Sequence, residues 1–371
     1  MKILHVIAAL GSGGAEVFVK DLCISLKQQG HDIAIAHIDS ARDQGGDIRF
    51  EDQFKAELVA EGIPVFEIGH ATRRNPVKGG FRLRAILKQL RPDILHIHLG
   101  LGVLLKSFTF YRLPTVYTHH SIVFRFGKAM TWWFDRFVQT YVAICGKCHV
   151  MLEQKTSRPI VDIRNGISSR RVASVDPARS TGSFKIISVG SIREAKDYPT
   201  TIAIAARVKQ LLKDNGRRLE FLIYGDGEGL EKLRDLTRQK GVDDIVHFLG
   251  LRTDIPERLA AADILLMSSI YEGMPISLIE ATHAGLPLIA TNVGGCSEIV
   301  RHGENGYIFQ PGDVEAGAIS IVMLYENPEL RRQFSVRSLE VAKEFSMLKV
   351  CALHIDLYEN TMELFAKKAD A

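Results

Sequence analysis

Short apolar runs alternate with longer amphipathic stretches along the first half of the chain. The runs are apolar almost throughout, as in strands that are buried on both faces of a sheet. The stretches between them place apolar residues three or four positions apart, which predicts helices. Strands are expected at residues 3–9, 33–38, 65–67, 94–98, 115–118 and 141–144, and helices at 16–29, 50–61, 81–90, 101–110 and 129–140. Buried strands that alternate with helices predict a parallel sheet covered by helices on both faces.

The pattern breaks near the middle of the chain and then restarts. Arg164-Asn165-Gly166 is a turn signal, and residues 168–183 are mostly polar without an apolar period, which indicates an interdomain linker. Strands are expected again at 185–189, 221–224, 245–249, 264–267, 287–290 and 307–309, with helices at 200–213, 229–240, 276–284 and from 313 onward. Each half therefore predicts a doubly wound, Rossmann-like unit, whose ligands bind outside the carboxyl ends of the strands.

The expected fold is thus α/β, with two doubly wound Rossmann-like domains facing across a cleft. The first domain is expected at residues 1–170, a linker at 171–183 and the second domain at 184–350. The last helix, 351–371, is expected to cross back to the first domain. A chain of 371 residues is long enough for two cores, since domains cluster near ~100–200 residues.

The net charge of +4 is unevenly distributed along the chain. Residues 1–180 contain 25 lysines and arginines against 16 acidic residues, whereas residues 181–371 contain 22 against 27. A basic first half favours an anionic partner, such as a phospholipid surface or a phosphate-linked substrate; ordinary solvated side chains are the alternative. The first residues are interpreted as a buried strand rather than a signal peptide. We therefore expect a cytoplasmic protein whose five cysteines are thiols.

Two glutamates, Glu272 and Glu280, flank a predicted helix start. Pro275 suits the first turn of a helix, where no backbone donor is needed. The amides of Ile276 and Ser277 are then free to bind a phosphate, which the helix dipole also favours. Glu280, about one turn further, can accept hydrogen bonds from a ribose diol, and Glu272 can hold sugar hydroxyls. The alternative is a pair of glutamates on a solvated helix, because the spacing alone is common.

These glutamates belong to a longer segment that resembles the retaining glycosyltransferases of family 4. The segment runs from Glu272-Gly273-Met274-Pro275 through Glu280-Ala281 to Gly285-Leu286-Pro287. Other matches to the family are Gly13-Gly14-Ala15-Glu16, Pro92 to His98, Thr118-His119-His120, Asn165-Gly166, Val189-Gly190 through Lys196-Asp197, Tyr224-Gly225-Asp226-Gly227, and Gly294-Gly295 through Glu298. The resemblance implies the GT-B fold, an acceptor-side first domain and transfer from a nucleoside-diphosphate sugar with retention of configuration.

The resemblance also implies roles for individual residues. Lys196 would neutralise the diphosphate leaving group, as a fixed cation does, and His120 would face the donor. The family usually has an arginine directly after Gly190, where this chain has Ser191. Arg193 can supply the missing cation, unless it is an ordinary surface arginine. The expected catalytic residues are Glu272, Lys196 and His120, and the expected donor-binding residues are Arg193, Gly273, Met274, Ile276, Ser277, Glu280, Gly13, Gly14 and Asn165.

No cofactor and no metal are expected. A dinucleotide fingerprint in the first glycine loop would need glycine at Glu16, where a negative charge stands instead. His96, His98, His119 and His120 come from two strands and have no cysteine or carboxylate at ligand spacing. The sequence contains no Asp-x-Asp pair for a divalent ion, so the cation role falls to Lys196 and to helix ends. The Cys145–His149 segment matches a haem-attachment pattern but is interpreted as a strand-to-helix turn.

A basic run and a set of aromatic residues in the first half allow two interpretations. The run contains Arg73, Arg74, Lys78, Arg82, Arg84, Lys88 and Arg91, and the aromatics are Phe124, Phe126, Trp132, Trp133, Phe134 and Phe137, beside Arg125, Lys128 and Arg136. Basic charge with interfacial aromatics fits an anionic bilayer at the inner face of the membrane or a lipid-diphosphate acceptor. Core aromatics with solvated arginines are the alternative. Nucleic acid is not expected, because sugar nucleotides explain the motifs.

The sequence thus predicts transfer of a sugar to a hydroxyl of a glycan or lipid-linked acceptor, in cell-surface polysaccharide synthesis. Two alternatives stay open. A sugar-nucleotide epimerase on the same fold would need no acceptor, and would isomerise the donor alone. A non-catalytic nucleotide-sugar-binding protein would bind the donor without transfer to any acceptor.

Overall fold

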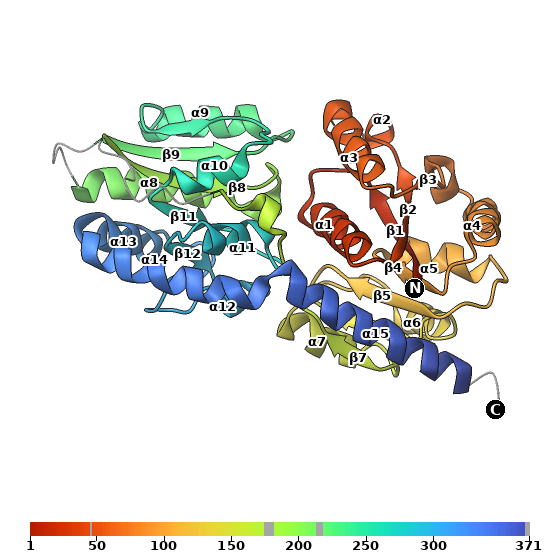
Figure 1. Cartoon of the computed structure of the whole chain (residues 1–371). Helices are drawn as coiled ribbons and strands as arrows, with labels where there is room; N and C mark the ends of the chain where they lie inside the picture. The colour runs from red at the N-terminus through yellow and green to blue at the C-terminus, as the bar shows by residue number, and fades with distance from the viewer. Residues whose placement is uncertain (45–46, 174–181, 213–217, 368–371) are drawn as a thin grey trace. The chain divides into compact units, whose positions relative to one another are not determined.

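A computed structural model describes residues 1–44, 47–173, 182–212 and 218–367, and the chain forms two compact units (Figure 1). The first unit is Met1–Ser168 together with Met347–Ala371, and the second is Ser169–Ser346. Helix α15 (Met347–Lys367) belongs to the first unit, where it packs against α1 (Gly14–Gln28). Most of the expected linker, residues 174–181, lies outside the described residues.

The first unit is built on a seven-stranded parallel sheet with the order β3-β2-β1-β4-β5-β6-β7. Its strands are β1 (Lys2–Ala9), β2 (Asp32–Asp39), β3 (Val65–Glu67), β4 (Ile94–Ile97), β5 (Thr115–His119), β6 (Thr140–Ala143) and β7 (Ile160–Asp162). The helices besides α1 and α15 are α2 (Ala41–Gln44), α3 (Ile48–Ala60), α4 (Pro76–Leu90), α5 (Gly100–Ser107), α6 (Lys128–Phe134) and α7 (Gly146–Glu153). The strand order reverses between β1 and β4, which is where doubly wound sheets bind ligands.

The second unit has a six-stranded parallel sheet with the order β10-β9-β8-β11-β12-β13. Its strands are β8 (Ser183–Val189), β9 (Arg218–Tyr224), β10 (Val246–Phe248), β11 (Ile264–Met267), β12 (Leu288–Thr291) and β13 (Gly306–Phe309). Its helices are α8 (Tyr198–Leu212), α9 (Leu230–Lys240), α10 (Ile255–Ala260), α11 (Ile276–His283), α12 (Cys296–Ile299), α13 (Val314–Glu326) and α14 (Pro328–Ala342). The order reverses between β8 and β11, so the loops after these two strands lie at the switch point.

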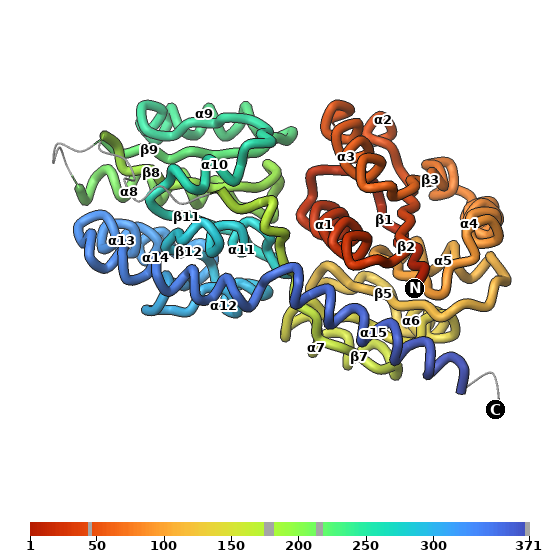
Figure 2. The backbone as a smooth tube through the Cα atoms, viewed as in Figure 1, coloured from red at the N-terminus to blue at the C-terminus, as the bar shows by residue number. Residues whose placement is uncertain are grey.

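The path of the chain confirms the prediction of two doubly wound α/β units, each with a parallel sheet between helices (Figure 2). The expected helix at 129–140 was too long: α6 ends at Phe134, and a turn carries the chain into β6. Aromatic and apolar residues crowd this stretch, so a helical period runs on past the true end. Strand β7 was missed because it is a short, half-exposed edge strand. Among the described residues, no helix is long and apolar enough to cross a bilayer.

Candidate active site

Two loops at the switch point of the second unit are joined by hydrogen bonds. One follows β8 and contains Lys196; the other follows β11 and contains Glu272. The amide of Ile270 donates to the carbonyl of Ala195 at 2.9 Å. The hydroxyl of Ser268 lies 3.1 Å from the carbonyl of Lys196 and also contacts the next carbonyl. The backbone therefore fixes the two loops against each other, and with them the side chains that they present.

Lys196 and Glu272 form an ion pair in these loops. The Nζ of Lys196 lies 2.6 Å from Oε1 of Glu272, and the hydroxyl of Ser269 donates to the same oxygen at 2.7 Å. The Lys196 side chain is 21% exposed and that of Glu272 is 12% exposed. Hydrogen bonds between charged groups are stronger than neutral ones, so both side chains are held in place. An ammonium group has three donors, which leaves Lys196 able to contact a phosphate as well.

Glycines let the neighbouring backbone approach this pair closely. A Cβ at Gly190 would lie 3.0 Å from Cε of Lys196. Gly225 has a φ of +154°, and a Cβ there would lie 1.9 Å from the carbonyl oxygen of Gly190. Gly294, with a φ of +51°, approaches from the loop after β12, where a Cβ would lie 2.0 Å from the carbonyl oxygen of Glu272. The glycines of the family motifs therefore fit the shape of this site.

The Gly294→Ala substitution should weaken donor binding by at least about tenfold, because the new methyl group must displace the Glu272 carbonyl. Gly303→Ala is the matched control, since Gly303 has a φ of +79° with no atom within 4 Å of its Cβ position. Both substitutions incur the left-handed backbone cost of about 1–2 kcal/mol. Calorimetric titration with nucleoside diphosphates measures the difference; equal affinities for the two variants would contradict the close-packing account.

Helix α11 begins beside the same loop. Pro275 stands at its N-cap rather than inside its first turn as expected, and Ile276 and Ser277 are the first helical residues. Their amides belong to the first turn, where backbone N–H groups have no partner within the helix. Met274 and Ile276 are buried, which anchors the helix start in the core. The helix start therefore offers backbone donors and a positive dipole end, as the sequence predicts.

Glu280 is buried in α11, with only 4% of its surface exposed. Its Oε1 accepts a hydrogen bond from Nε of Arg171 at 2.9 Å and a second from Nη2. Arg171 could not be predicted as a partner of Glu280, because it lies 109 residues away in a polar stretch whose composition indicates a linker. Arg193 is exposed on the loop after β8, and Ser191 is half-buried. The structure thus brings a new cation to Glu280, while Arg193 points to solvent.

The first unit places its predicted residues at the ends of its own strands. Gly13 is the N-cap of α1, and Gly14 is the first helical residue, directly after β1. His120 follows β5, and its Nε2 lies 3.0 Å from Nδ1 of His98, which follows β4. Asn165, after β7, is 2% exposed. Gly13, Gly14 and His120 therefore lie around the switch point of this sheet, and Asn165 lies beyond its edge strand.

Buried histidines form a cluster beside His120. His5 on β1 and His96 on β4 are register partners in the sheet, and Nδ1 of His5 lies 3.0 Å from Nε2 of His98. Both nitrogens of His96 are bonded, to the hydroxyls of Tyr358 and Thr118 at 2.7 Å each. His5 could not be predicted as a member of this cluster, because a single histidine in an apolar strand carries no signal. His5, His96 and His98 each have a ring nitrogen within 4.8 Å of those of the other two, a spacing at which a metal ion could bind.

Burial lowers the pKa of these histidines. The pKa of His5 falls to about 3 and that of His120 to about 3, because burial penalises the charged ring. The pKa values of His96 and His98 also lie well below the ordinary value, first through burial and then through neighbouring histidines. The imidazoles are therefore neutral at pH 7. Because both His96 nitrogens already have hydroxyl partners, the observed contacts are those of a hydrogen-bonded cluster rather than of a metal centre.

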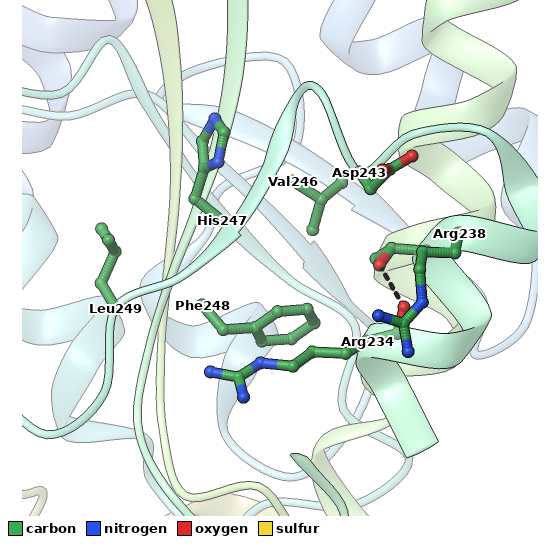
Figure 3. Close-up of a pocket in the computed structure, with 8 residues that line it drawn as sticks. Arg234, Arg238, Asp243, Val246, His247, Phe248 and Leu249 are labelled. Atoms are coloured by element: carbon green, nitrogen blue, oxygen red, sulfur yellow. Dashed lines mark hydrogen bonds between the residues drawn. The ribbon is translucent and has the colours of Figure 1, made fainter. Parts of the chain in front are cut away.

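An open depression of about 400 Å³ lies elsewhere on the second unit, between α9 and β10 (Figure 3). Its lining includes Arg234 and Arg238, together with Val246 and Phe248 from the edge strand. It contains none of the predicted site residues. The two arginines already pair with acidic neighbours on their own helix, so the depression has no unbalanced charge for an anionic ligand.

Comparison with known proteins decides the family. The family model "Glycosyl transferases group 1" matches residues 170–340, and "Glycosyltransferase Family 4" matches residues 12–171. The chain belongs to these glycosyltransferases. Together the two matches cover both units, and each falls on one of them.

The relatives of this glycosyltransferase include proteins from several bacteria. A putative glycosyltransferase EpsD of Bacillus subtilis is 26% identical over 313 residues, which is 77% of this chain and 81% of that protein. An Escherichia coli UDP-Gal:alpha-D-GlcNAc-diphosphoundecaprenol alpha-1,3-galactosyltransferase is 29% identical over 147 residues, 38% of each chain. The structure of Anabaena Alr3699/HepE with UDP and glucose has a TM-score of 0.80 at 20% identity, covering 97% of this chain and 99% of that one. The fold of this glycosyltransferase is therefore the GT-B fold.

Proposed function

We propose that this glycosyltransferase is a retaining, metal-independent hexosyltransferase. It moves a sugar from a nucleoside-diphosphate sugar to a hydroxyl of a glycan or lipid-diphosphate-linked acceptor. The observation that carries the proposal is the Lys196–Glu272 ion pair at the switch point of the second sheet. A fixed cation, a carboxylate and a helix start gather there, and this set matches a diphosphate joined to a sugar.

Each residue has a task that follows from its chemistry. Lys196 and the amides of Ile276 and Ser277 stabilise the negative charge that develops on the departing diphosphate. Glu272 accepts hydrogen bonds from sugar hydroxyls. As the bond between the sugar C1 and the phosphate oxygen breaks, the acceptor oxygen bonds to C1 from the same face, and its proton passes to a leaving phosphate oxygen. Glu272 is not the nucleophile in this scheme, because Lys196 and Ser269 hold its carboxylate.

Arg171 affects how Glu280 can bind a ribose. In this structure the guanidinium of Arg171 occupies hydrogen-bond positions on the buried carboxylate. A ribose diol that binds Glu280 shares the carboxylate with Arg171 or displaces it. A buried carboxylate needs a partner, since an unpaired buried charge is costly. Arg171 therefore satisfies Glu280 when no donor is bound. The first unit contributes His120, Gly13, Gly14 and Asn165 to donor and acceptor binding.

Names of relatives support the acceptor class. The Escherichia coli relative acts on a sugar joined to diphosphoundecaprenol, as its name states, and the basic first half of this chain is suited to such a phosphate-linked acceptor. We propose the same acceptor class here, in cell-surface polysaccharide synthesis.

The experiment that tests this function is a screen of UDP- and GDP-sugars with lipid-diphosphate acceptors, in the presence of EDTA. We expect transfer from one donor, with an α-linkage in the product by NMR when the donor is α-linked. Inversion at C1 would contradict retention, and loss of transfer in EDTA with recovery on adding Mg²⁺ would contradict metal independence. Isomerised donor without acceptor would favour the epimerase.

We also propose that the first unit binds an anionic bilayer. Of the aromatics singled out in the sequence, Phe124 and Phe134 are buried, but Trp132 on α6 is 60% exposed. Phe110, which the sequence did not single out, is 76% exposed, and it follows α5, which contacts α6. The guanidinium of Arg136 lies 3.9 Å from the ring centre of Trp132. Exposed aromatics beside cations are typical of membrane interfaces.

The double variant Trp132→Ser, Phe110→Ser should reduce sedimentation with phosphatidylglycerol vesicles by about tenfold, because it removes two exposed aromatic anchors. Val59→Ser is the control, since Val59 is also exposed, at 64%, but lies on α3. Equal sedimentation of the double variant and the wild type would overturn the membrane proposal. So would equal binding to neutral phosphatidylcholine vesicles.

A further inference from the structure

Three histidines of the first unit form a continuous hydrogen-bonded chain. Nε2 of His120 lies 3.0 Å from Nδ1 of His98, and Nε2 of His98 lies 3.0 Å from Nδ1 of His5. The ring planes of His98 and His120 are inclined by 28° with their centres 5.2 Å apart, and those of His5 and His98 by 13° with their centres 5.3 Å apart. The two end nitrogens, Nδ1 of His120 and Nε2 of His5, are buried and make no hydrogen bond within the described residues.

In a row of neutral imidazoles, all the hydrogen bonds between the rings run in the same direction. Each neutral ring carries one proton, so one nitrogen donates and the other accepts. In one arrangement the protons lie on Nδ1 of all three rings: His5 donates to His98, and His98 donates to His120. In the other arrangement they lie on Nε2 of all three rings, and every bond reverses. The proton position on His120 is therefore linked to that on His5, two rings away.

The two arrangements leave different groups unsatisfied. The Nε2 arrangement leaves an N–H of His5 without an acceptor in the core. The Nδ1 arrangement leaves an acceptor nitrogen there instead, and puts the unsatisfied N–H on His120. Buried N–H groups without a partner are rarer than under-satisfied acceptors. His120 as a whole is half-buried and follows β5 at the switch-point end of the sheet, whereas His5 is fully buried within β1. Nδ1 of His120 is covered in the absence of a ligand, but a shift of this segment exposes it to a ligand oxygen, which cannot happen to Nε2 of His5.

We infer that His98 is a positioning residue that holds His120 in the tautomer with its proton on Nδ1. His120 then presents an N–H donor to an oxygen of the bound substrate, a sugar hydroxyl or a phosphate. The inference deepens the proposed function, since the substrate oxygen is the one that this function supplies. Lowered pKa values keep the three rings neutral at pH 7. The hydrogen bonds between the three histidines therefore keep the same direction.

The test is the histidine tautomer state by ¹⁵N NMR of the full chain without ligand. We expect protons on Nδ1 of His5, His98 and His120 in the wild type. A proton on Nε2 of His120 would overturn the inference whatever the activity of the protein. Because this measurement needs no substrate, its outcome is independent of whether the transferase function holds.

Variants test the role of His98 separately. His98→Leu should let His120 populate both tautomers and lower kcat/KM by about tenfold, as expected for one lost hydrogen bond. His98→Gln, whose amide can still donate to His120, should keep the Nδ1 tautomer and stay within about threefold of the wild type. His354→Leu is the control, because it removes a buried imidazole that is not one of the three hydrogen-bonded histidines. The ring of His354 bonds to the carbonyl of Val350 instead. A His98→Leu protein with an unchanged His120 tautomer would refute the positioning role.

Discussion

Lys196→Ala should lower the kcat of sugar transfer by about 10²–10³, the effect of removing one donor from a charge-stabilising site. The ammonium group lies in the bonded pair of loops at the switch point, 2.6 Å from Glu272, and no water molecule can replace its fixed charge. Initial rates with the best donor from the screen measure the effect.

Lys209→Ala is the matched control for this substitution. Lys209 also forms an ion pair, with Asp244, but it lies on the exposed face of α8. Its removal should leave kcat within about twofold, since surface pairs contribute little to stability. A Lys196→Ala enzyme that transfers as fast as the Lys209→Ala enzyme would show that the leaving group is stabilised by other groups.

Lowering the pH from 7.5 to 5.5 should reduce the free energy of unfolding of the first unit by several kcal/mol. This is the second large effect that we expect. Burial lowers the pKa of six imidazoles in its interior below the ordinary 6.5: His5, His96, His98, His119, His120 and His354. As the pH falls below 6.5, the unfolded chain takes up protons that the folded unit does not. The contribution of these neutral histidines to stability is therefore fully present above about pH 6.5. It decreases as the pH falls from there toward the pKa values of the folded state, which are near 3–4 for His5 and His119. Each histidine contributes about 1 kcal/mol between pH 7.5 and 5.5.

Hydrogen exchange at pH 7.5 and 5.5, corrected for the intrinsic exchange rates, measures this effect in each unit of the same molecule. Protection should fall in β1, β4 and β5 and change less in β8 and β11. The His354→Leu variant removes one of the titrating groups, so its loss of stability with falling pH should be smaller by about 1 kcal/mol. Equal loss of protection in the two units would contradict the assignment to the buried histidines.

The sequence was most informative where local pattern and motif coincide. The apolar runs predicted the buried parallel strands, and Glu272, Lys196 and the start of α11 meet at one switch point. Two partners could not be predicted. His5 joins His98 only because parallel pairing sets β1 beside β4, and register is not visible in an isolated strand. Arg171 reaches Glu280 from a stretch without periodicity. Both contacts depend on tertiary packing rather than on local sequence.

Calorimetric titration of the wild type and Lys196→Ala proteins with UDP, GDP and ADP, in EDTA, tests the central claim most directly. We expect one of the three nucleotides to bind the wild type without metal, and its affinity to fall at least about tenfold in the variant, a difference of about 1.4 kcal/mol. If none of the nucleotides binds, or if Lys196→Ala binds as tightly as the wild type, then the ion pair at the carboxyl ends of β8 and β11 does not hold a diphosphate.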